Sequence, residues 1–133
     1  MISTRAILMP LAAIAALATC GGGNDENPTP GSLIVQVTST TSEDGAILLT
    51  IQGSKVTNVR PLRGSIWINL VDNTHQKILL RGSLDAGNLI EFDVPNPDKV
   101  ANYTATVEQV AGRSNSYALL LPADFPLQVV KAP

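Results

Sequence analysis

Apolar and polar residues alternate over most of the chain from residue 32 onward, in short runs that are separated by turn residues. A period of two residues is typical of half-buried β-strands, whose successive side chains point to opposite faces. Clusters of Gly, Pro, Asn and Asp between the runs indicate turns. Strands are predicted over residues 32–38, 46–52, 55–59, 65–71, 75–81, 89–94, 102–110, 117–121 and 127–130, with one helical turn at 98–101.

The alternation also predicts which side chains face the core. The expected inward positions are Ile47, Leu49, Ile51, Ile66, Ile68, Leu70, Ile78, Leu80, Ile90, Phe92 and Val94. Trp67, Asn69, Glu91 and Asp93 then point outward. Eight or nine short strands at intervals of about ten residues, with no long helical period, predict one all-β sandwich over residues 32–133. Pro61 makes the strand before it unsuitable for the middle of a sheet.

The residues before this domain have a different composition and show no alternation. Residues 6–18 are almost wholly apolar and follow a basic residue, Arg5. As a helix they would rise about 20 Å, which is too short for a hydrocarbon core of about 30 Å. A basic start with a short apolar run is typical of an export signal. Residues 1–19 are therefore expected to be a cleaved leader. Residues 20–31, with no hydrophobic side chain after the cysteine except proline, are expected to form a disordered tether of about 20 Å.

The apolar run ends in Leu17-Ala18-Thr19-Cys20, and Cys20 is the only cysteine of the chain. This ending resembles the lipobox of bacterial lipoproteins, in which the cysteine is acylated on sulfur and the leader is cleaved just before it. Leu17, Ala18 and Cys20 match the motif, whereas Thr19 stands where Gly, Ala or Ser is usual. The resemblance implies cleavage between Thr19 and Cys20 and acyl chains such as palmitate on Cys20. Gly21, rather than aspartate, implies outer-membrane sorting in a host with two membranes.

Two physical arguments agree with a lipid at Cys20. Each buried CH₂ contributes about 0.8 kcal/mol, so two or more acyl chains give a stable membrane anchor. The chain has no second cysteine, so an intramolecular disulfide is impossible and the thiol needs another explanation. The alternative is a plain secretory signal that leaves a free thiol. Both interpretations predict an exported protein, and the first attaches it to the cell envelope.

The charge of the mature chain excludes some partners. The leader holds one base and no acid, which leaves eleven acids against eight bases and a formal charge of −3. This weakly acidic balance provides neither the basic footprint of a nucleic-acid-binding protein nor a polybasic membrane patch. We therefore expect no nucleic-acid partner. The expected partners are the membrane, through the amino-terminal lipid, and an envelope protein or polysaccharide.

Few residues indicate chemistry, and we expect no catalytic residue, metal or cofactor. His75 is the only histidine, and there is no Gly-x-Ser-x-Gly nucleophile motif. Glu91 and Asp93 share a strand face and could act as acid and base, although such pairs are usually the solvated side of a sheet. Oxygen ligands that calcium takes occur at residues 72, 73 and 98, without a twelve-residue acidic loop. A small hydrolase stays a remote alternative.

Trp67 is the candidate for recognition, together with Asn69 on the same strand face. An aromatic ring beside an amide can stack on and hydrogen-bond a sugar or a peptide, although Trp67 could instead pack under a loop or itself be the inward face of the strand. The run 82–94, followed by 103–107, resembles cohesin-type, related carbohydrate-binding and other immunoglobulin-like sandwiches. This resemblance implies a binding module and carries over no binding residue. The expected function is a non-enzymatic, lipid-anchored envelope protein that displays a β-sandwich for binding or structural roles.

Overall fold

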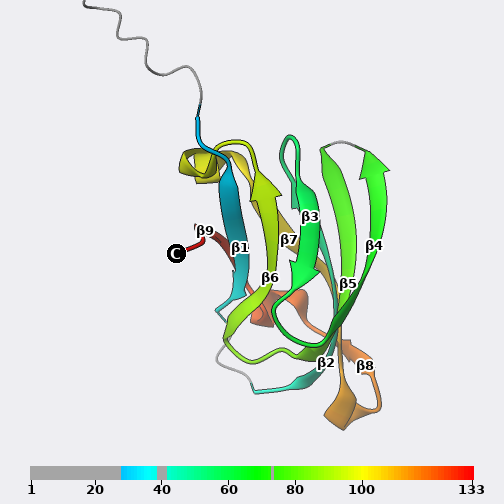
Figure 1. Cartoon of the computed structure of the whole chain (residues 1–133). Coiled ribbons are helices and arrows are strands. Elements are labelled where there is room, and N and C mark those ends of the chain that lie inside the picture. The colour runs from blue at the N-terminus through cyan, green and yellow to red at the C-terminus, as the bar shows by residue number, and fades with distance from the viewer. Residues whose placement is uncertain (1–27, 39–41, 73) are drawn as a thin grey trace, which may run out of the picture.

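The computed structural model describes residues 28–38, 42–72 and 74–133, which form two antiparallel β-sheets packed face to face (Figure 1). The strands are β1 (Gly31–Val37), β2 (Asp44–Gln52), β3 (Thr57–Pro61), β4 (Ser65–Asp72), β5 (His75–Ser83), β6 (Gly87–Val94), β7 (Thr104–Gly112), β8 (Ala118–Leu120) and β9 (Leu127–Lys131). The smaller sheet has the order β3-β6-β1-β9 and the larger one β4-β5-β2-β7-β8. The predicted all-β sandwich is thus confirmed, with nine strands in the described residues.

Three short 3₁₀ helices connect the later strands: η3 (Pro97–Asn102), η4 (Arg113–Asn115) and η5 (Pro122–Asp124). The helical turn predicted at residues 98–101 lies inside η3, which Asn96 caps by accepting a hydrogen bond from the backbone N–H of Asp98. Among the described residues, no helix has the length and apolar character needed to cross a bilayer.

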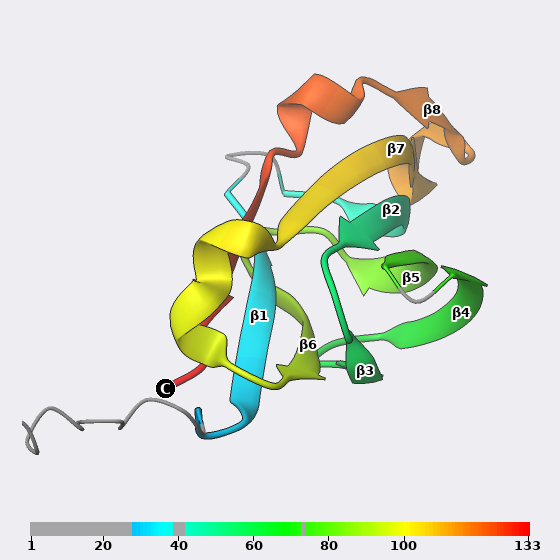
Figure 2. The ribbon, with the colours of Figure 1, turned by 90° about the horizontal axis from the view of Figure 1, so that it is seen from above.

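An apolar core fills the space between the two layers, which separate clearly when the molecule is seen from above (Figure 2). The predicted inward residues of β2, β5 and β6 are buried, and the ring of Phe92 lies 5.9 Å from that of Tyr103. Two fully buried residues, Leu84 and Phe125, come from segments predicted as loops. Because the described domain contains no cysteine, it has no disulfide bond, and this packing has to supply the stability that disulfides would otherwise add.

Some predicted boundaries and orientations were wrong. The third strand covers Thr57–Pro61 rather than residues 55–59, and β1 begins at Gly31, one residue before the predicted start of the first strand. Ile68 was expected in the core, but its side chain is 45% exposed. The reason is that β4 is the last strand of the larger sheet and extends past β3, the last strand of the smaller one (Figure 2). The side chains of residues 69–72 lie outside the described part.

A β-bulge in β7 shifts the alternation along that strand. Leu48 of β2 is opposite Gln109, while Leu49 is opposite Val107, so Glu108 is the additional residue. Beyond the bulge Val110 is buried, although strict alternation from Tyr103 would have pointed it outward. Bulges re-aim side chains in this way, and here the bulge places Glu108 beside the neighbouring strands β2 and β5.

Candidate functional site

The predicted lipidation and cleavage residues, Cys20 and Thr19, lie outside the described residues. The candidate that the structure does describe is Trp67, on the outer face of the larger sheet. Its side chain is 56% exposed, so the prediction that it points away from the core is confirmed. Asn69 was predicted to share the face of Trp67. In the pairing with β5, Trp67 is opposite Leu79 and Asn69 is opposite Lys77, so the backbone register places positions 67 and 69 on the same face.

Trp67 begins a row of apolar side chains that crosses three strands. Trp67 is opposite Leu79 of β5, and Leu79 is opposite Leu48 of β2. Directly opposed residues of an antiparallel pair share a face, with their Cβ atoms about 4.5–5.5 Å apart. Leu79 is 38% exposed and Leu48 is half-buried. The three side chains therefore form a contiguous apolar row on a solvent-facing sheet.

A second row runs beside the first, toward β8. It joins Arg81, Ala46, Ala111 and Leu119, of which Leu119 is 68% exposed. The guanidinium carbon of Arg81 lies 5.9 Å from the centroid of the Tyr117 ring, within the range of a cation–π interaction. We call the outward-facing residues of these two rows, with Tyr117, the Trp67 face.

Sequence analysis did not include the leucines of the Trp67 face, although a signal for two of them was present. Leu48 and Leu79 each sit in an unbroken apolar triplet, residues 47–49 and 78–80. In a sheet with one wet face, the middle residue of such a triplet has to point to the solvent side. Because their opposition across β2 and β5 depends on strand order, the row itself became visible only in the structure.

A polar band borders the Trp67 face on the side of the β7 bulge. Thr50 donates a hydrogen bond to Glu108 at 2.8 Å, and the Nζ of Lys77 lies 3.3 Å from the same carboxylate. These contacts, the Thr50 hydrogen bond foremost, lower the pKa of Glu108 from its ordinary value. The larger sheet thus presents an apolar row and fixed hydrogen-bonding groups side by side.

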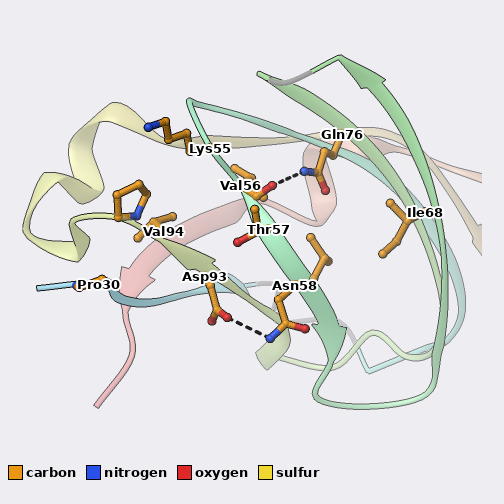
Figure 3. A pocket seen from close by; sticks show the side chains of 11 residues that line it. Pro30, Lys55, Val56, Thr57, Asn58, Ile68, Gln76, Asp93 and Val94 are labelled. Carbon is orange, nitrogen blue, oxygen red and sulfur yellow. Dashed lines mark hydrogen bonds between the residues drawn. The ribbon is translucent and has the colours of Figure 1, made fainter.

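A groove opens on the other side of β4, between the edges of the two sheets. It has a volume of about 840 Å³, and Val56, Val94 and Ile68 line much of it. The buried side chain of Gln76 also lines the groove and donates to the carbonyl of Val56 at 2.6 Å (Figure 3). Among the described residues, no aromatic side chain lines the groove, Trp67 included. The groove and the sheet face that carries Trp67 are therefore separate surfaces.

The carboxylates considered as an acid–base pair, Glu91 and Asp93, are both held by Arg60. Its Nη2 lies 3.0 Å from Glu91, and its Nη1 lies 3.0 Å from Asp93. Asp93 also accepts hydrogen bonds from Asn58 at 2.9 Å and from Ser32 at 2.8 Å. These contacts lower the pKa of Asp93, and the hydrogen bond from Asn58 has the largest effect, followed by those from Ser32 and Arg60. A general acid needs the opposite shift.

This arrangement makes stability depend on pH. A carboxylate with a lowered pKa stabilises the fold fully above its unfolded pKa of about 4, and this contribution disappears as the pH falls through its folded value. We expect Asp93→Asn to reduce the loss of thermal stability of the chain between about pH 5 and pH 2. The thermal midpoint, followed by circular dichroism across this range for wild type and variant, measures the effect.

Asn58→Ala provides the matched control for the cause of that shift. It keeps the carboxylate of Asp93 but removes the hydrogen bond with the largest influence on its pKa. The acid-side loss of stability should then be intermediate between those of the wild type and Asp93→Asn. Identical slopes for all three proteins would show that Asp93 does not contribute to acid sensitivity.

His75 begins β5, where its Nδ1 lies 2.9 Å from the hydroxyl oxygen of Thr74. It lines neither the groove between the sheets nor the two smaller hollows around Asp44. Of the oxygen donors considered for calcium, the carboxylate of Asp98 pairs with Lys131. Within the described residues, no three His, Cys, Asp or Glu side chains are grouped as ligands of a metal ion.

Comparison of the chain with protein-family models, with curated proteins and with solved structures gave no match in any of the three.

Proposed function

We propose that this chain is an exported, lipid-anchored envelope protein without enzymatic activity, whose β-sandwich binds a protein partner through the Trp67 face. The leader residues Leu17, Ala18 and Cys20 support the anchor, because they resemble a lipobox and leave the single thiol with a role. Gly21 supports the outer membrane as the destination. The short segment between Cys20 and Gly31 would hold the sandwich close to the lipid surface.

The observation that carries the binding role is the row Trp67–Leu79–Leu48, which lies on the solvent-facing side of the larger sheet. Large apolar side chains are common singly on protein surfaces, but a contiguous group is characteristic of an interaction site. Tryptophan, tyrosine and arginine are also the residues most enriched among energetic hot spots. Trp67, Tyr117 and Arg81 lie on the same face. Its leucine-rich composition favours a protein surface as the ligand.

Capture from a detergent extract of the envelope, with the tagged full chain as bait, tests this function. The double variant Trp67→Ala, Leu79→Ala should retain the fold and lose at least about tenfold in captured partner, as hot-spot truncations do. Leu62→Ala is the matched control, because Leu62 is 43% exposed and lies outside the Trp67 face. Equal recovery of every captured protein by wild type and double variant would contradict the proposal.

One observation favours a polysaccharide as the second candidate ligand. The band formed by Lys77, Thr50 and Glu108 offers fixed donors and acceptors on the same sheet face as Trp67, beside the apolar row, as a sugar platform does. Retention of the full chain on immobilised envelope polysaccharide distinguishes the two ligands. Glu108→Gln should weaken binding to a polysaccharide, whereas it should leave a partner that contacts the apolar row unaffected.

A further inference from the structure

The two sheets have four edge strands in the described residues, and three of them carry features that discourage pairing with another chain. β3 has Arg60 and ends in Pro61, and β9 follows Pro126 and ends in Lys131. β8 has three residues and is soon followed by a proline. Proline, basic residues and short length are the usual means of protecting a sheet edge.

The fourth edge, β4, has none of these protections between residues 65 and 70, and its pairing with β5 shifts register only beyond them. Its eight residues contain no proline, lysine or arginine, and its one charged residue, Asp72, stands at its end. Ile68, on the groove side, is 45% exposed, and Trp67, on the other side, is 56% exposed. In Figure 1, β4 forms the outer margin of the larger sheet. Its free row of backbone N–H and C=O groups is therefore a template for another strand.

We propose that β4 pairs antiparallel with the β4 strand of a second copy of this chain. A two-fold axis perpendicular to the sheet joins the two five-stranded sheets into one continuous sheet. The proposal does not depend on the partner suggested for the Trp67 face. If both copies are also anchored to one lipid surface, their confinement raises the effective concentration and favours the pairing.

The sequence of β4 selects the register of this pairing. When Ile68 lies opposite Ile68 of the second copy, Ile66 lies opposite position 70, so the inward-facing positions of both strands are apolar. On the outer face, Trp67 then lies opposite position 69. A register centred on Trp67 would place position 70 opposite Gly64, whose φ of 60° ends the extended backbone. A register centred on position 69 would oppose Ile66 to an aspartate.

Charge favours a second copy as the occupant. No residue from 65 to 71 is charged, so the two strands meet without like charges opposed. Arg63 precedes β4 and Asp72 ends it, so antiparallel pairing with a second copy brings residues of opposite charge to the same end of the two joined strands.

Disulfide cross-linking of the full chain in membranes tests both the dimer and its register. Directly opposed residues of an antiparallel pair have Cα atoms about 4.5–5.5 Å apart, which is within disulfide range. Under mild oxidation, Ile68→Cys should therefore form a covalent dimer at least about tenfold faster than Gln128→Cys on the β9 edge. Wild type, which contains only Cys20, shows the background on the same non-reducing gel.

A second arm keeps the test decisive if Ile68→Cys fails to fold. Trp67→Cys and Asn69→Cys, co-expressed with different tags, should cross-link to each other, because these positions are opposed across the two-fold axis. Each variant expressed singly should not cross-link, since its two copies are offset by about 7–8 Å. Cross-linking of Ile68→Cys at the rate of Gln128→Cys, or to a different protein, would overturn the proposal. A Cys20 dimer in wild type would count against the lipid anchor only.

Discussion

Replacement of Leu80 by alanine is expected to lower the free energy of unfolding by about 2–5 kcal/mol, the usual cost of removing a fully buried leucine side chain. Leu80 has no exposed surface and faces the core from β5, an inner strand of the larger sheet. The loss is large beside a total stability of about 5–15 kcal/mol for a domain of this kind. Urea unfolding of the full chain, followed by circular dichroism, measures it.

Leu79→Ala is the matched control, because it makes the same chemical change one residue away on the same strand. Leu79 is 38% exposed on the opposite face, so its truncation should cost at most about 1 kcal/mol. The difference between the two variants isolates burial from strand propensity. Equal losses would mean that the two faces of the larger sheet are not distinct in the way described.

Replacement of Cys20 by alanine is expected to abolish both processing of the leader and attachment to the membrane. Without the thiol there is no site for acyl chains, each CH₂ of which would contribute about 0.8 kcal/mol to anchoring. The variant should accumulate with its leader uncleaved or appear in the soluble fraction. Membrane fractionation with mass spectrometry of the amino terminus distinguishes these forms from an acylated wild type.

Thr19→Gly is the companion variant for Cys20→Ala. It restores the small residue that is usual before the cysteine of a lipobox and leaves the thiol in place. Cleavage should be at least as complete as in wild type, with Cys20 acylated at the new amino terminus. A Cys20→Ala protein that is processed and retained like wild type would exclude lipid attachment at this residue.

Strand faces could be predicted wherever one side of a strand meets the core and the other meets water. In β6, Ile90 and Phe92 point inward and Asp93 points outward, as the period of two requires. The edge position of β3 followed from Pro61, since proline cannot donate to a central ladder. Both predictions rest on local patterns, and local patterns are contained in the sequence.

Features that depend on long-range contacts could not be predicted in this way. Ile68 alternates like a core residue, yet whether a second sheet covers it depends on where that sheet ends. Val110 is buried because the bulge at Glu108 adds a residue to one strand. Phe125 is buried from an irregular segment, which has no periodicity to reveal it.

The candidate site was predictable in the same partial way. The outward direction of Trp67 followed from the alternation of its neighbours on β4. The presence of Leu79 and Leu48 beside it on the same face could not be predicted. Leu79 comes from the adjacent strand of the hairpin, whereas Leu48 comes from a strand nineteen positions earlier than Trp67 in the chain. The order of the strands in the sheet brings these three residues together. That order depends on how whole strands pair and on how the two sheets pack, and not on the residues near Trp67 in the sequence.

The position of β1 has a mechanical consequence. Any tension on the amino-terminal segment enters the domain at Gly31, the first residue of β1, which is bonded to β6 on one side and to β9 on the other. The bonds of both antiparallel ladders run perpendicular to the strand, so a pull along β1 loads them in shear and all at once. A body held by this end to a moving surface is therefore built to keep its shape when it is dragged.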